Sequence, residues 1–164
     1  MISFYPGPSK IYPQLAEYMQ EAANSGILSA NHRSPEFVEM CQQTISSLKE
    51  KLAIPSTYTV FFASSATECW EIIGQSFIDQ LSVHIYNGAF GKKWFNYRKK
   101  LSENAIGHEF SAQRMIGLNA LEVPQQTGLI CLTQNETSNG TQVRGRLIQK
   151  IKKRYAKALI CVDA

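Results

Sequence analysis

Side chains that could hold a phosphate or a charged ring follow several apolar runs of the sequence. Residues 61–68 read Phe-Phe-Ala-Ser-Ser-Ala-Thr-Glu, and the small residues would let an anion reach the N–H groups of the helix that follows. Ala66 and Thr67 are therefore candidate phosphate ligands. Ser65 or Thr67 could equally serve only as the N-cap of that helix.

Three further positions could hold a flat, positively charged ring. Phe90 lies in a turn after an apolar run and could stack on such a ring. Asp163 follows the apolar residues 159–162, where a carboxylate is costly unless it meets a positive partner such as a protonated pyridine nitrogen. The polar run 133–141, which contains Thr137, could bind ring substituents. The ordinary alternatives are core packing for Phe90, a helix cap for Asp163 and turn formation for the polar run.

His32 and Arg33 stand together in a loop, residues 29–34. An arginine can grip a carboxylate through two parallel hydrogen bonds, although a surface arginine often has no such partner. Other catalytic patterns are absent from the sequence. Gly88-x-x-Gly91-Lys92 lacks the spacing and the Ser or Thr of a nucleotide phosphate loop, and no Gly-x-Ser-x-Gly or His-Glu-x-x-His occurs. The four cysteines are scattered, so neither a zinc site nor a disulfide scaffold is expected.

Alternating helices and strands must position these side chains. The apolar spacing predicts helices over residues 13–24, 35–52, 67–77, 92–101 and 146–157, the second with Ser34 as its N-cap and Pro35 at its first position. Short β-branched or apolar runs predict strands over residues 58–63, 81–86, 106–110, 129–133 and 158–162. This alternation predicts an α/β fold, a mostly parallel sheet covered by helices on both faces. In such a fold ligands bind beyond the carboxyl ends of the strands.

Composition narrows the class of protein. The 164 residues are 44% hydrophobic and carry a net charge of +4, which suits a globular protein and permits an anionic partner. No apolar run approaches the about 20 residues of a membrane span, and no secretory signal is visible, so a cytoplasmic protein is expected. Basic residues gather in 92–100 and 144–157, where the helical spacing favours solvated outer faces over a nucleic-acid interface.

An ordered set of short motifs resembles a known family. The motifs are Phe4–Pro8, Asn31–Ser34, Ser65–Glu68, Gly88–Phe90, Asn135–Thr137 with Asn139–Gly140, and Val162–Ala164. The set resembles the class V aminotransferases of the fold-type I pyridoxal-phosphate enzymes, and within them most closely the phosphoserine aminotransferase family. The resemblance implies the large-domain fold of those enzymes, with residues 1–55 as an N-terminal segment and residues 56–164 as the first half of the cofactor-binding domain.

The resemblance also implies a role for each candidate. Pyridoxal 5'-phosphate would place its phosphate on Ala66 and Thr67, its ring under Phe90, its 3-oxygen near Thr137 and its ring nitrogen on Asp163. His32 and Arg33 would lie at the substrate side. The Schiff-base lysine of the family would lie beyond residue 164, so these residues alone are not expected to transaminate.

The implied reaction exchanges amino and keto groups between glutamate and 3-phosphohydroxypyruvate in a homodimer, with small amino and 2-oxo acids as partners. Alternatives are an alanine–glyoxylate or desulfurase-like class V member, or a non-catalytic basic α/β domain that binds nucleic acid or protein. Neither a metal nor a membrane is expected as a partner.

Overall fold

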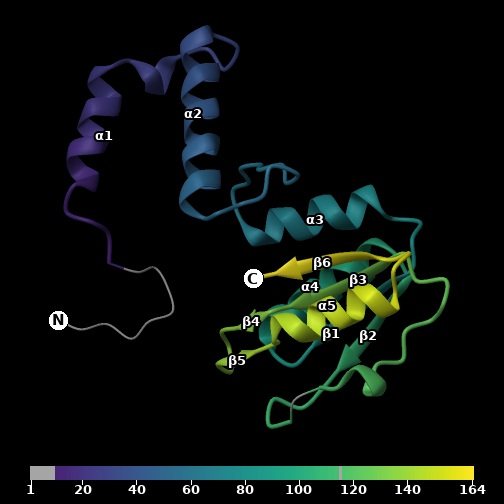
Figure 1. The fold of residues 1–164 in the computed structure, drawn as a ribbon. Helices are drawn as coiled ribbons and strands as arrows, with labels where there is room; N and C mark the ends of the chain where they lie inside the picture. Colours follow the sequence, from purple (N-terminus) through teal and green to yellow (C-terminus); the bar gives the residue numbers. More distant parts are fainter. Residues whose placement is uncertain (1–9, 115) are drawn as a thin grey trace. The chain divides into compact units, whose positions relative to one another are not determined.

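The computed structural model of the chain describes residues 10–114 and 116–164 (Figure 1). The chain divides into two compact units, Met1–Phe62 and Ala63–Ala164. The Phe4–Pro8 motif lies outside the described residues, and the division between residues 55 and 56 remains a prediction.

The described residues of the N-terminal unit, from residue 10 onward, form two helices and one short 3-10 turn. They are α1 (Leu15–Asn24), η1 (Ile27–Ser29) and α2 (Pro35–Lys51). Helix α2 begins as predicted, because the Ser34 Oγ accepts a hydrogen bond from the Phe37 N–H at 3.3 Å and Pro35 occupies the first helical position. Gly26, with a φ of +76°, follows the end of α1 in the left-handed conformation that glycine adopts without strain. Neither helix has a buried residue.

The strand predicted over residues 58–63 is wrong, since these residues pair with no strand among the described residues. Tyr58, Phe61 and Phe62 are all exposed. Their aromatic character matches a sheet surface, but a strand forms only where a neighbouring strand accepts its backbone hydrogen bonds. Residues 58–62 belong to the N-terminal unit, in which no strand is described.

The C-terminal unit is built on a four-stranded parallel sheet, as predicted. The strands lie in the order β2 (Ala105–Glu109), β1 (Ser82–Tyr86), β3 (Leu129–Thr133) and β6 (Leu159–Asp163). All five residues of β1 and of β3 are buried, including the polar Ser82 and His84 of β1, as expected for the central strands of a parallel sheet covered on both faces. The strand order changes direction at β1, so the ends of β1 and β3 form the switch point where ligands bind in open sheets.

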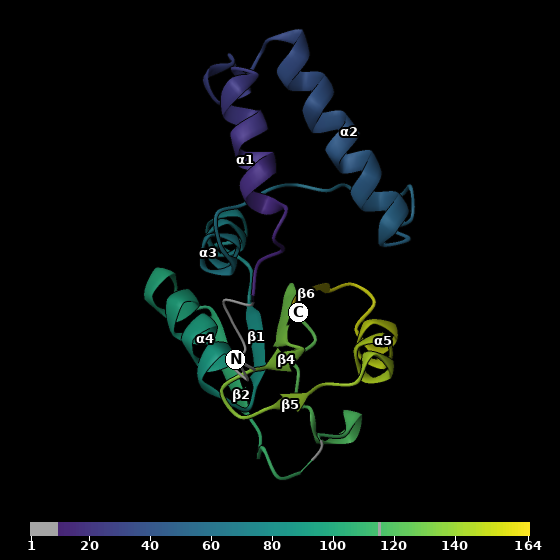
Figure 2. The same ribbon diagram turned by 90° about the vertical axis from the view of Figure 1, so that its left-hand side faces the viewer.

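Helices cover both faces of this sheet, and Figure 2 shows them on opposite sides. Helices α3 (Ala66–Ser76) and α4 (Ala89–Leu101) pack on one face through Trp70 and Trp94. Helix α5 (Gly145–Arg154) packs on the other through Ile151, near the 3-10 turn η2 (Leu118–Ala120). A small hairpin, β4 (Asn135–Glu136) and β5 (Thr141–Gln142), lies in the run predicted as a polar loop.

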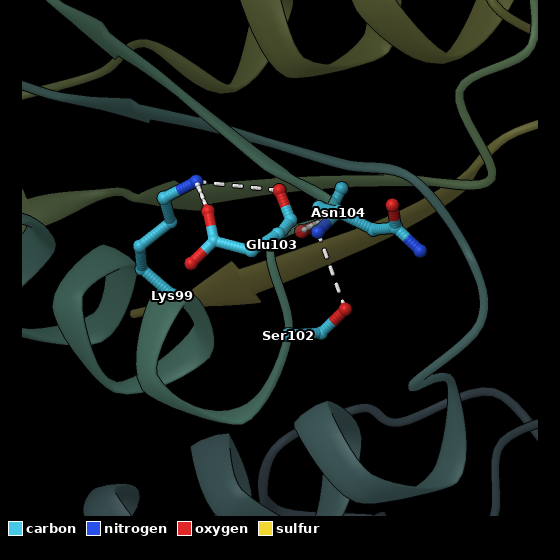
Figure 3. A network of polar contacts seen from close by, with 5 residues as sticks. Lys99, Ser102, Glu103 and Asn104 are labelled. Atoms are coloured by element: carbon cyan, nitrogen blue, oxygen red, sulfur yellow. Dashed lines mark hydrogen bonds and ion pairs between the residues drawn. The ribbon is translucent and has the colours of Figure 1, made fainter.

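Polar contacts close the connection from α4 to β2 (Figure 3). The Lys99 ammonium pairs with the Glu103 carboxylate and also donates to the Glu103 carbonyl at 3.3 Å. The Ser102 Oγ accepts from the Asn104 N–H at 3.2 Å. The Asn104 carbonyl in turn accepts from the Ser82 N–H at 3.0 Å, which places the start of β1 beside the start of β2.

A histidine is buried in the core on the face that α4 covers. His84 is 2% exposed, and its ring lies 5.5 Å from that of Trp94 and 5.7 Å from that of Phe95. Neither ring nitrogen has a hydrogen-bond partner. Burial, helped by the positive charge of Arg98, lowers the pKa of His84 to about 3. The imidazole is therefore neutral in the folded protein at ordinary pH.

This histidine is expected to make the fold sensitive to acid. Below about pH 6.5 the His84 imidazole is protonated in the unfolded chain but stays neutral in the folded chain. The free energy of unfolding therefore falls as the pH decreases toward 3. Between pH 7 and pH 5 the His84 share of this loss is about 2 kcal/mol. In denaturant titrations at pH 7 and pH 5, His84→Leu should lose about 2 kcal/mol less unfolding free energy than the wild type between the two pH values. His108→Leu, at a half-buried position on β2, should show the same loss as the wild type. Equal pH dependence of the wild type and His84→Leu would refute the assignment.

None of the helices in the described part of the chain combines the length and apolarity needed to span a membrane. Residues 10–114 and 116–164 also contain no group of three or more His, Cys, Asp or Glu side chains placed to hold a metal ion.

Candidate functional site

The N-terminus of α3 offers free backbone donors. The Ser65 Oγ accepts from the Glu68 N–H at 3.1 Å, so Ser65 is the helix cap. The Glu68 carboxylate accepts from the N–H and the Oγ of Ser64, at 2.6 and 2.7 Å. Ala66 and Thr67 occupy the first two helical positions, where N–H groups have no partner within the helix. The capping alternative therefore holds for Ser65, and Thr67 remains available to a ligand.

The N-terminus of α4 is occupied by the protein itself. The buried Glu136 carboxylate accepts from the Phe90 and Gly91 N–H groups at 3.3 and 3.0 Å. The Ser138 Oγ accepts from the Ala89 N–H at 2.9 Å. An anion from outside therefore has no free donors at the first turn of α4. Of the two helices that pack on this face of the sheet, only α3 can receive a phosphate at its N-terminus.

Two glycines permit the close contact between α4 and the strand ends. A Cβ on Gly88 would lie 2.4 Å from the Glu136 Cγ, and a Cβ on Gly91 would lie 2.4 Å from the Tyr86 Cβ. Both distances are far below van der Waals contact. The Gly88-x-x-Gly91 pattern therefore serves packing, consistent with its exclusion as a nucleotide phosphate loop.

Asp163 ends β6 beside the buried Thr133, its register partner on β3. Burial raises the pKa of Asp163, the negative charge of Glu136 raises it further, and the Trp70 side chain opposes both. In the described residues no lysine, arginine or histidine lies within ion-pair distance of this carboxylate. A half-buried carboxylate that faces a second carboxylate and lacks a basic neighbour favours a bound cation.

The structure brings most of the predicted residues to the same strand ends. Glu136 contacts the N–H of Phe90 and is close enough to Asp163 to shift its pKa. Trp70 also influences Asp163, and it lies three residues after Thr67 on the same face of α3. Figure 1 shows the N-terminal end of α3 on the side where β6 ends. Thr67, Phe90 and Asp163 therefore lie around the carboxyl ends of β3 and β6.

The remaining candidates differ in their settings. Phe90 is 44% exposed, so its ring is accessible to a ligand. Thr137 is also exposed and directly follows Glu136. His32 and Arg33 are exposed in the N-terminal unit, where the Arg33 N–H donates to the Asn31 Oδ1 at 2.8 Å. The roles assigned to these two residues remain predictions.

Glu136 and Trp70 also belong to this candidate site, and the sequence analysis did not predict them. A signal for Glu136 does exist in the sequence. Helix α4 has no acidic residue in its first turn, so the positive end of its dipole needs a partner from elsewhere. Trp70 gives no comparable signal, because a tryptophan at helical spacing indicates core packing alone.

Two structural features fit pyridoxal phosphate. The free donors of α3 suit its phosphate, and the uncompensated Asp163 suits a protonated ring nitrogen. Thr133 adds a buried hydroxyl that has no hydrogen-bond partner. The residues present are therefore chemically compatible with this cofactor.

Known proteins give an independent comparison. No protein-family model matches the chain. It is 25% identical over 154 residues to the phosphoserine aminotransferase of Lysinibacillus sphaericus, covering 87% of this chain and 42% of the relative. The phosphoserine aminotransferase of Azobacteroides pseudotrichonymphae is 27% identical over 153 residues, with coverages of 86% and 42%. The chain thus spans less than half the length of these relatives.

Solved structures agree. The crystal structure of a phosphoserine aminotransferase from Cytophaga hutchinsonii matches 96% of this chain and 44% of its own, with a TM-score of 0.87 and 35% identity. A pyridoxamine-pyruvate aminotransferase from Mesorhizobium loti matches 99% of this chain and 41% of its own, with a TM-score of 0.80 at 16% identity, which shows the fold alone. The chain has a partial class V aminotransferase fold, of the fold-type I pyridoxal-phosphate-dependent transferases, and is similar to phosphoserine aminotransferases over most of its length.

Proposed function

We propose that this chain forms part of a pyridoxal-phosphate-dependent aminotransferase that converts phosphoserine and 2-oxoglutarate to 3-phosphohydroxypyruvate and glutamate, in either direction, in serine biosynthesis. The observation that carries the proposal is Asp163, a carboxylate without a basic neighbour at a strand end, near the start of α4 and the free donors of α3. The similarity to phosphoserine aminotransferases supports the choice of substrate.

Each residue of the site has a task in this proposal. The N–H groups of Ala66 and Thr67 hold the phosphate, and Asp163 keeps the ring nitrogen protonated through a charge-assisted hydrogen bond. Phe90 covers the ring, and Thr137 donates to its 3-oxygen. The bound cofactor supplies the electron withdrawal that lets the substrate α-carbon lose its proton. Glu136 fixes Phe90 and Thr137 relative to each other, because its carboxylate binds the start of α4 and Thr137 is the next residue.

Substrate recognition is assigned to the N-terminal unit. Arg33 binds the substrate carboxylate with two parallel hydrogen bonds, and His32 lies beside it. The enzyme acts as a cytoplasmic homodimer on small amino and 2-oxo acids.

The competing nucleic-acid reading is disfavoured by the contacts of the basic residues. The Lys93 ammonium lies 5.9 Å from the centre of the Trp70 ring and 5.8 Å from that of Tyr97, and Lys100 lies 5.9 Å from Tyr97. Arg98 is 3% exposed. Burial therefore removes Arg98 from the basic surface of α4, while Lys93 and Lys100 stay exposed but lie against aromatic rings of the protein.

A panel of amino donors tests the proposal in a polypeptide of the relatives' length that carries these residues. We expect glutamate to form from 2-oxoglutarate with phosphoserine, at a kcat/KM at least about tenfold above that with alanine, because the phosphate adds charge-assisted contacts. Activity with alanine and glyoxylate or with cysteine, but not with phosphoserine, would show that phosphoserine is the wrong substrate and would assign the protein to another class V activity. Absence of turnover with every donor, together with salt-dependent binding of nucleic acid, would overturn the enzyme assignment.

A further inference from the structure

Two cysteines lie side by side behind the candidate site. Cys131 on β3 and Cys161 on β6 are register partners on adjacent parallel strands, so their side chains project from the same face of the sheet. Both belong to the core packed under Trp70 and Trp94. Cys161 precedes Asp163 by two residues and shares its face.

The two thiols have different environments. Cys131 is 2% exposed, whereas Cys161 is partly exposed, and both are free. The two neighbouring thiols influence each other, and their interaction raises the pKa of Cys131 and lowers that of Cys161. Cys161 is therefore the more readily ionised and the more accessible of the two, and thiolates rather than thiols ligate soft ions.

The geometry disfavours a disulfide between them. Adjacent strands are about 4.8 Å apart, and side chains stand roughly perpendicular to the sheet. A disulfide requires Cβ atoms about 3.5–4.5 Å apart, which is closer than Cβ atoms that project side by side from strands at this spacing. A single atom between the two sulfurs spans the wider gap.

The surroundings also limit the kind of ion. His84 is the register partner of Cys131 on the other side, but its ring turns toward Trp94 and Phe95. Within the described residues no third His, Cys, Asp or Glu completes a metal-ligand group. Zinc, which takes four ligands in structural sites, is therefore not expected. Soft centres that accept two thiolates, such as Cu(I), suit the pair.

We propose that Cys131 and Cys161 form a dithiol site for a soft, thiophilic centre that accepts two sulfur ligands. Phenylarsine oxide is the probe, because its trivalent arsenic forms two As–S bonds while both S–H bonds break and the oxygen leaves as water. No electron is transferred in this step. An ion bound by the two cysteines would lie next to Asp163 on the same face of the sheet, in the core that contains Trp70 and Trp94.

Mass spectrometry of the 164-residue chain tests the proposal after treatment with phenylarsine oxide and an excess of monothiol. We expect one adduct per chain, lost in Cys161→Ala and in Cys131→Ala. Cys41→Ala and Cys69→Ala are the matched controls and should retain it, since these cysteines lie in α2 and on the exposed surface of α3. An adduct that persists in Cys161→Ala, or no adduct in the wild type, would overturn the proposal.

Tryptophan fluorescence gives a second readout that needs no cofactor. The chain has two tryptophans, Trp70 and Trp94, and both pack on Cys131. Binding should quench the emission of the wild type and of both control variants, but not that of Cys161→Ala. Since Cys161 lies on an edge strand, this variant should fold even if Cys131→Ala does not. Quenching that is unchanged in Cys161→Ala would contradict the proposed site, whatever the outcome for the aminotransferase assignment.

Discussion

Replacing Arg98 by methionine is expected to lower the free energy of unfolding by about 3–5 kcal/mol. The guanidinium is buried and donates five hydrogen bonds at 2.8–3.3 Å. Four go to the backbone carbonyls of Gly74, Phe77, Ile78 and Gln80, and one goes to the Ser82 Oγ. These groups belong to the end of α3, the connection after it and the start of β1.

The effect is large because the carbonyls cannot find other partners. Each buried polar group left unsatisfied costs about 1–3 kcal/mol, and methionine fills much of the volume without donating a hydrogen bond. Arg98 also fixes the direction of α3, whose far end carries Thr67. Its loss should therefore loosen the candidate phosphate site as well as the core.

Chemical denaturation followed by circular dichroism measures this effect. Arg146→Met, on the exposed first turn of α5, is the matched control and should change stability by less than about 0.5 kcal/mol. Arg98→Lys should lie between the two, since one ammonium group cannot reach all five acceptors. A loss below about 1 kcal/mol in Arg98→Met would show that the buried network is not a main source of stability.

Replacing Asp163 by alanine is expected to weaken binding of the phosphorylated B6 cofactor at least about tenfold. A hydrogen bond between charged groups contributes about 1.5–3 kcal/mol, and tenfold corresponds to 1.4 kcal/mol. The effect is specific because burial and the negative charge of Glu136 raise the pKa of Asp163, and no basic side chain among the described residues forms an ion pair with it. A cationic ring nitrogen would offset the free-energy cost of keeping the Asp163 carboxylate charged, whereas a neutral ligand would not.

Asp79→Ala provides the matched control for this prediction. Asp79 and Asp163 are the two aspartates of the chain, and Asp79 is exposed in the connection between α3 and β1. Its removal changes the net charge by the same amount without touching the strand ends. Binding should therefore be unchanged in Asp79→Ala, and inorganic phosphate should compete in both variants because it occupies the same donors on α3.

The central sheet was predictable from sequence because its strands are buried on both faces. Residues 81–86 and 129–133 are rich in apolar and β-branched residues, and the structure places β1 and β3 within these ranges. The resemblance rests on motifs at strand ends, because Asn135–Thr137 begins two residues after β3 and Val162–Ala164 spans the end of β6. The comparisons with phosphoserine aminotransferases confirm that resemblance.

Features that depend on distant partners could not be predicted. Helix α4 begins at Ala89, three residues before the predicted start, because Glu136 binds its first N–H groups from 46 residues away along the chain. Phe90 therefore lies in a helix rather than in a turn. Residues 58–63 have the composition of a strand but pair with none that is described. In both cases the local structure depends on a contact with a distant part of the chain: α4 has such a contact at its start, and residues 58–63 lack a described partner strand.

Titration of pyridoxamine 5'-phosphate into the chain measures the cofactor site itself, because this amine form needs no lysine to hold it. We expect saturable binding that quenches the fluorescence of Trp70, weakens at least about tenfold in Asp163→Ala and is unchanged in Asp79→Ala. Absence of saturable binding, or equal affinities in the wild type and Asp163→Ala, would show that Asp163 does not hold the cofactor.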